Sequence, residues 1–155
     1  MSKPQVKAEL IHLSGFRILK SYFETDFNNE DNPQVSHFGL GVKSESGFNF
    51  EDNAVRFRLF IKIKGFDEEE NEVGVRGEYH LEYYFIIENL NEFVTFKNSE
   101  DYIVDTLIGG TLAGIAYSTS RGIILDRTQS TDFKGVILPV INPQDLLTED
   151  TYTEM

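Results

Sequence analysis

Hydrophobic and polar residues alternate along much of the first half of the chain. In Ala54–Lys64, apolar side chains occupy every second position, and Arg56, Arg58, Lys62 and Lys64 fall between them. This period of two predicts a strand with one buried and one solvated face. Less regular alternation predicts three further strands, at Ser14–Asp26, Ser36–Lys43 and Val73–Glu88. The order of these segments predicts antiparallel strands joined by polar loops.

The pattern changes to a helical one after Asn98. Asn98 and Ser99 are favoured at helix N-caps, and the acids Glu100 and Asp101 would face the positive end of the helix dipole. We therefore predict one long helix from Ser99 to about Arg127. The bulky residues of one face follow at helical spacing: Val104, Ile108, Leu112 and Ile115.

A stripe of small residues lies beside the bulky one in the predicted helix. The stripe comprises Gly109, Ala113, Ala116 and Ser120, and Gly110 and Gly114 lie beside it. Each of the three glycines costs about 1 kcal/mol relative to alanine, so close approach of another backbone is expected. The segment Thr106–Tyr117 has no charged residue, and a helix that is apolar all round is covered on all sides. Either its own sheet wraps it, or a partner subunit covers the second face. We expect the partner, and the predicted interface residues are Gly109, Gly110, Ala113, Gly114 and Ala116.

The C-terminal part is predicted to be extended and then briefly helical. Val136–Ile141 is apolar, Asn142 can cap a short helix that Pro143 opens, and the acidic residues after it predict a frayed tail. Strands followed by helices indicate an α+β fold, and no linker or repeat divides residues 1–155, so a single domain is expected.

Charge and composition limit the classes of partner that the protein is expected to bind. The net charge of −12 argues against binding to nucleic acid or to anionic membranes and favours basic partners, although solubility alone would explain it. The uncharged run of the helix is shorter than the ~20 residues that span a bilayer, so no membrane insertion is expected. The N-terminus lacks a signal-peptide pattern, which predicts a cytoplasmic protein.

No residue pattern typical of catalysis is visible. The chain has no cysteine, and its histidines, His12, His37 and His80, are far apart in the sequence, so no metal or other cofactor is predicted. G-G-T-L-A-G at Gly109–Gly114 lies within a helix and lacks the lysine of a phosphate-binding loop.

Two segments resemble the SecB-like chaperone family. They are F-R-I-L-K-S-Y-F-E at Phe16–Glu24, and S-R-G at Ser120–Gly122 followed by I-L-P-V at Ile137–Val140 and a leucine pair. The resemblance implies a four-stranded antiparallel Greek-key sheet packed on one long helix, with a short C-terminal helix. It also implies dimers that join edge to edge and pair through their long helices into homotetramers. Members of the family hold unfolded polypeptides.

The resemblance also implies binding residues. The export branch of the family delivers clients to the SecA motor through two acids on the first strand; Glu24 matches the second, but Lys20 replaces the first. SecA is therefore one candidate partner, and a dedicated client such as an antitoxin is another. The family's client groove lies between the crossover loop and the C-terminal helix. The candidate client-binding residues are Phe27, Phe38, Phe48, Phe50, Ile137, Val140, Leu146 and Leu147.

The function predicted from the sequence is thus a SecB-like holdase chaperone without catalysis, acting in protein transport or for a dedicated client. Two alternatives belong to other classes. A hot-dog-type thioesterase also packs a long helix on an antiparallel sheet, and Asp105 is the best candidate for its catalytic acid. A non-catalytic adaptor protein is the third possibility.

Overall fold

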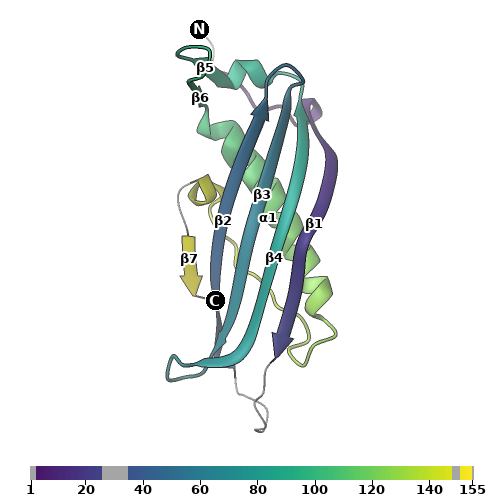
Figure 1. Cartoon of the computed structure of the whole chain (residues 1–155), viewed down its shortest axis with the longest axis vertical. Coiled ribbons are helices and arrows are strands. Elements are labelled where there is room, and N and C mark those ends of the chain that lie inside the picture. The colour runs from purple at the N-terminus through teal and green to yellow at the C-terminus, as the bar shows by residue number, and fades with distance from the viewer. Residues whose placement is uncertain (1–2, 26–34, 148–150, 155) are drawn as a thin grey trace.

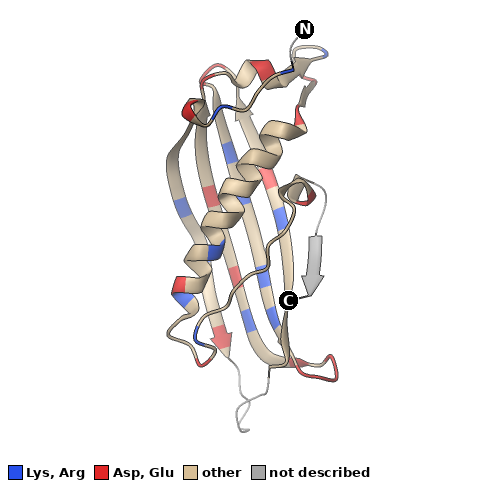
Figure 2. Cartoon of the chain, turned by 180° about the vertical axis from the view of Figure 1, so that it is seen from behind, with Lys and Arg blue, Asp and Glu red and all other residues tan. Residues whose placement is uncertain are grey.

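A long antiparallel sheet carries one helix across one of its faces (Figures 1 and 2). The structure is a computed structural model, and it describes residues 3–25, 35–147 and 151–154. The main strands are β1 (Ile11–Thr25), β2 (His37–Asn49), β3 (Ala54–Phe66) and β4 (Glu72–Ile87). A short strand, β7 (Thr151–Glu154), completes the sheet order β1-β4-β3-β2-β7.

The first four strands form a Greek key. The consecutive strands β2, β3 and β4 are neighbours, whereas β1 lies antiparallel to β4 at the far side from β2. β1 and β2, consecutive in the chain, thus lie on opposite sides of the β3–β4 pair, which is the arrangement expected from the resemblance. The α+β class and the four-stranded antiparallel sheet are both confirmed.

The core lies between the sheet and helix α1 (Thr106–Thr128). The alternation of β3 buries every second side chain from Val55 to Ile63, and the arginines and lysines between them point to the opposite face. Helix α1 contributes Ile108, Leu112 and Ile124 to this core. The strict sequence alternation thus arises because only one face of the sheet carries the helix.

Helix α1 begins later than its sequence predicted. Asn98 forms the turn of a hairpin between β5 (Val94–Phe96) and β6 (Tyr102–Val104), where its Oδ1 accepts hydrogen bonds from the backbone N–H groups of Glu100 and Asp101. The residues that resemble a helix N-cap therefore satisfy a turn instead. The true N-cap is Asp105, whose carboxylate accepts a hydrogen bond of 2.8 Å from the Leu107 N–H.

The remaining segments are short or irregular. The described residues include three 3-10 helices, η1 (Ala8–Leu10), η2 (Leu90–Phe93) and η3 (Pro143–Leu147), of which the last is the predicted C-terminal helix. The prediction of a wholly frayed tail was wrong for residues 151–154, because they pair with β2. No helix among the described residues is long and apolar enough to cross a membrane.

Candidate functional site

Four aromatic rings pack together where β2 ends. Phe48 and Phe50 stack with their ring centroids 5.7 Å apart, and Phe50 lies edge-on to Phe96 at 5.0 Å and to Tyr102 at 4.8 Å. Phe96 is 50% exposed and Tyr102 is 41% exposed. These four residues are called the aromatic cluster below; Phe48 and Phe50 are partly buried against the core, and Phe96 and Tyr102 form its solvent-exposed surface in the single chain.

The β5–β6 hairpin positions half of the aromatic cluster. Phe96 pairs with Tyr102 in the hairpin register, so both rings point to the same side, and the Asn98 turn fixes that register. Ile103, between Tyr102 and Val104, points to the other side of the hairpin and is 54% exposed. The sequence predicted Phe48 and Phe50 but missed Phe96 and Tyr102, because Tyr102 was assigned to the helix and Phe96 to a connector.

A second exposed apolar surface lies on the extended segment after α1. The Tyr117 hydroxyl donates to the Pro139 carbonyl at 2.7 Å, and Arg121 Nε donates to the Leu138 carbonyl at 3.0 Å. These bonds hold the segment along the helix (Figure 2) and bury Leu138. Ile137 and Val140, two of the predicted client-binding residues on the same segment, are 70% and 81% exposed. The S-R-G and I-L-P-V motifs therefore contact each other directly.

The other predicted client-binding residues lie elsewhere. Leu146 is only 1% exposed and belongs to the core, so its assignment to an open groove conflicts with the structure. Leu147 is half-buried against the same core. Phe38 lies at the opposite end of β2 from Phe48, where its ring contacts Phe133 at 5.5 Å between centroids. Phe27 lies outside the described residues.

The small-residue stripe of α1 is covered within the chain. A Cβ atom on Gly109 would lie 3.0 Å from the Leu147 side chain, one on Gly110 would overlap Gln144, and one on Gly114 would lie 3.3 Å from Pro143. The other two predicted interface residues, Ala113 and Ala116, are fully buried. The close approach expected of these glycines is thus to η3, and their place in an oligomer interface stays a prediction that one chain does not test.

The outward face of α1 also lacks charge over most of its length. Leu107 and Ile115 are exposed there, and a shallow hollow of about 230 Å³ lies between the helix and the extended segment. Gly122 lines this hollow, and a Cβ atom on it would meet no atom within 4 Å. The described part of the chain therefore supplies no reason for a glycine at this helix position.

The opposite face of the sheet is polar and internally paired. Glu82 is fully buried among Arg17, Arg58 and Tyr84, with Arg17 Nε 3.0 Å from its carboxylate. Burial alone would raise the pKa of Glu82, but the hydrogen bonds from Tyr84 and the two arginines outweigh it and lower the pKa to about 2. Glu82 is therefore ionised at neutral pH and acts in stabilising the sheet.

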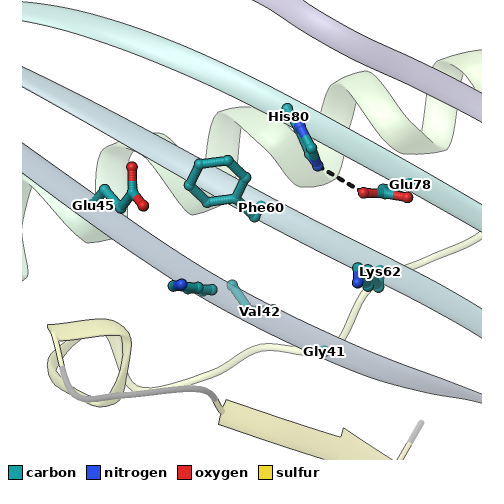
Figure 3. A pocket seen from close by; sticks show the side chains of 8 residues that line it. Gly41, Val42, Glu45, Phe60, Lys62, Glu78 and His80 are labelled. Carbon is teal, nitrogen blue, oxygen red and sulfur yellow. Dashed lines mark hydrogen bonds and ion pairs between the residues drawn. The ribbon is translucent and has the colours of Figure 1, made fainter.

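A hollow on this polar face is shown in Figure 3. His80 Nε2 lies 2.8 Å from the Glu78 carboxylate, which also accepts hydrogen bonds from Lys20 and Tyr22. Burial alone would raise the pKa of Glu78, but the hydrogen bonds lower it by more than burial raises it, so the pKa lies below its ordinary value. The hollow measures about 370 Å³, and its lining residues are Gly41, Val42, Lys43, Glu45, Phe60, Lys62, Glu78 and His80.

Two further predicted residues have structural partners. Glu24 pairs with Arg76 across β1 and β4. Asp105, the acid considered for catalysis, caps α1. Within the described residues no group of histidines and acids is arranged to hold a metal ion.

Comparison with known proteins gives a fold likeness without a sequence relationship. No model of a known protein family matches the chain, and no curated protein sequence matches it. The SecB-like chaperone Rv1957 of Mycobacterium tuberculosis, solved with a ChAD peptide from the HigA1 antitoxin Rv1956, is similar in structure with a TM-score of 0.59 at 14% identity. The likeness covers 86% of this chain and 92% of that one. A protein of unknown function from Streptococcus agalactiae matches with a TM-score of 0.42 at 9% identity, over 84% of this chain and 97% of that one.

Proposed function

We propose that this protein is a SecB-like holdase that binds unfolded segments of client polypeptides without catalysis. The observation that carries the proposal is the aromatic cluster, in which Phe48 and Phe50 pack against the core while the rings of Phe96 and Tyr102 stay about half open to solvent. A holdase needs apolar surface that accepts many sequences, and large exposed apolar patches mark such binding sites. The fold likeness to a chaperone solved with a client peptide supports the same function.

The aromatic cluster is suited to unfolded chains because it makes few specific demands. Phe48, Phe50 and Phe96 offer no hydrogen-bonding group, and Tyr102 offers only a hydroxyl. Ile137 and Val140 add a second apolar surface on the extended segment. The acidic charge of the chain would attract basic clients at long range.

Replacing the two exposed rings tests this proposal. An aromatic side chain buries about 150–250 Å² when it is covered, so a half-exposed ring has about 100 Å² left to bury, worth about 2 kcal/mol before ordering costs. The double variant Phe96→Ser/Tyr102→Ser should therefore bind a fluorescently labelled unfolded protein at least about tenfold more weakly. If this variant and the wild type bound the unfolded protein with equal affinity, the aromatic cluster would not be part of the binding site.

Ile103→Ser is the matched control. Ile103 lies on the same hairpin and is as exposed as Phe96, but it points away from the aromatic cluster. Its replacement should leave the affinity within about twofold, since solvent-exposed substitutions change little. If Ile103→Ser weakened binding as much as the double variant, the effect would come from disturbing the hairpin.

We further propose that the subunits assemble through two surfaces. Strand β1 is a sheet edge on which Leu13, Phe16 and Leu19 are exposed, and such an edge favours pairing with another copy. The outward face of α1, with Leu107, Ile115 and Gly122, favours helix-to-helix packing. Together these surfaces are compatible with a dimer of dimers.

Delivery to SecA receives less support. The Glu24 carboxylate pairs with Arg76, and Lys20 Nζ lies 3.1 Å from Glu78, so β1 presents pairs of opposite charge rather than two free acids. We therefore favour a dedicated client over SecA as the partner.

A further inference from the structure

The C-terminal strand covers only part of one sheet edge. β7 lies antiparallel to β2, with Thr151 opposite Val42 and Glu154 opposite Gly39 (Figure 1). From Lys43 to Asn49, β2 has no strand beside it on this side within the described residues. At about 3.3 Å per residue, this open edge is roughly 20 Å long. An open edge presents backbone N–H and C=O groups that can pair with another extended chain.

The open edge leads from β7 to the aromatic cluster. Phe48 is near its end, and Phe50 follows directly after β2. An extended chain that continued along β2 beyond β7 would therefore arrive at the exposed rings of Phe96 and Tyr102. The backbone edge thus leads to the apolar surface, and η3 lies against the helix side of β2 at Ser44.

We propose that β2 binds a client segment as an added antiparallel strand, and that residues 151–154 compete with the client for the same edge. This inference rests on the proposed holdase function and specifies how the client is held. Backbone pairing would supply affinity that is independent of the client's sequence. Successive side chains of the client would contact the two faces of the sheet beside β2 in alternation.

The two faces of β2 indicate which client segments fit. On the helix side, Ser44 and Phe48 face the region of η3 and the aromatic cluster; the Ser44 hydroxyl donates to the Leu146 carbonyl. On the opposite side, Lys43 and Glu45 are exposed and line the polar hollow of Figure 3. The preferred client segment therefore alternates, with aromatic or aliphatic residues on one side and polar residues of either charge on the other.

Competition by the tail is tested in the full-length chain with Tyr152→Pro/Thr153→Pro. Successive residues of a strand direct their N–H groups to opposite edges, so two adjacent prolines remove a pairing N–H whichever edge faces β2. The probe is a fluorescein-labelled twelve-residue peptide in which Val or Phe alternates with Thr, Lys or Glu. If β7 holds the edge about nine-tenths of the time, the variant should bind the probe about tenfold more tightly by fluorescence anisotropy. Thr153→Val, which keeps the strand propensity, is the control and should leave the affinity unchanged.

Strand addition is tested with N-methylated versions of the same peptide. Methylating the N–H groups of odd residues blocks one edge of the peptide, and methylating those of even residues blocks the other, while the side chains stay the same. An added strand uses one edge, so one methylated peptide should lose binding by more than tenfold and the other should keep it. Equal binding of the two would overturn strand addition but leave the holdase proposal standing.

The remaining outcomes separate the parts of the proposal. An unmodified peptide that binds neither the wild type nor the proline variant would overturn strand addition, and failure to bind a whole unfolded protein as well would overturn the holdase function. An unchanged affinity of the proline variant would overturn competition by residues 151–154.

Discussion

Gly122 allows a sharp test of assembly, because one added methyl group should act in opposite directions on a single chain and on an oligomer. Gly122 lies inside α1, where a glycine costs about 1 kcal/mol relative to alanine. Among the described residues, no atom other than those of its chain neighbours and the nearby helix backbone lies within 4 Å of the position that its Cβ would take. In an isolated subunit, Gly122→Ala should therefore be stabilising.

The effects of Gly122→Ala on an isolated subunit and on an oligomer differ enough to be measured. A gain of about 1 kcal/mol raises Tm by about 3 °C for a chain of this size. If a second helix packs on the hollow beside Gly122, the added methyl group overpacks that contact at a cost of about 1–3 kcal/mol. The dissociation constant of the assembly should then rise by about tenfold or more, since each 1.4 kcal/mol corresponds to a factor of ten.

The assay combines sedimentation with thermal unfolding over a dilution series. At concentrations where both proteins are dissociated, Gly122→Ala should melt higher than the wild type, which provides an internal control for helix propensity. At higher concentrations the wild type should be tetrameric and the variant smaller. A variant that melts higher and keeps the wild-type mass at every concentration would refute packing at Gly122, and a monomeric wild type at micromolar concentration would refute assembly altogether.

Three further predictions follow from individual contacts. Glu82→Gln should lower the free energy of unfolding at neutral pH by about 2 kcal/mol. Because the folded-state pKa of about 2 lies below the ordinary 4.5, the stabilisation by Glu82 is present above pH 4.5 and is lost as the pH falls towards 2. Urea unfolding at a series of pH values should therefore show a free energy of unfolding that falls less steeply with acid for the variant than for the wild type. An identical pH dependence of the two proteins would contradict the assignment. Leu146→Ala should cost about 2–5 kcal/mol, whereas Ile137→Ala should change stability by less than about 0.5 kcal/mol, so similar losses in chemical denaturation would contradict their opposite burial. SecA should bind weakly even at low salt; tight binding that Glu24→Lys abolishes would prove this prediction wrong.

The strands with the strictest patterns were the ones predicted most accurately. β3 and β4 have a helix on one face and solvent on the other, so their burial follows the alternation of the sequence. β2 was predicted to end at Lys43 but continues to Asn49. Its last part, with Ser44, Ser46 and Gly47, lacks apolar alternation because η3 and the hairpin, rather than the centre of α1, lie near it.

The start of α1 was mispredicted because Asn and Ser stabilise turns and helix caps by the same hydrogen bonds. Only the pairing of Val94–Phe96 with Tyr102–Val104 decides between these uses, and that pairing is a tertiary contact. The same error hid Phe96 and Tyr102 from the candidate site. The burial of Leu146 was equally hidden, since an apolar pair after a proline has the same sequence whether it faces the core or solvent.

Affinity for the unfolded form of a protein, compared with the folded form of the same protein, tests the central claim most directly. The probe can be a disulfide-bonded protein in its native form and after reduction and carboxymethylation, which keeps it unfolded. The account predicts binding of the unfolded form with micromolar or lower Kd, without nucleotide, and no measurable binding of the native form by calorimetry. Equal affinity for both forms, or affinity for neither, would contradict it.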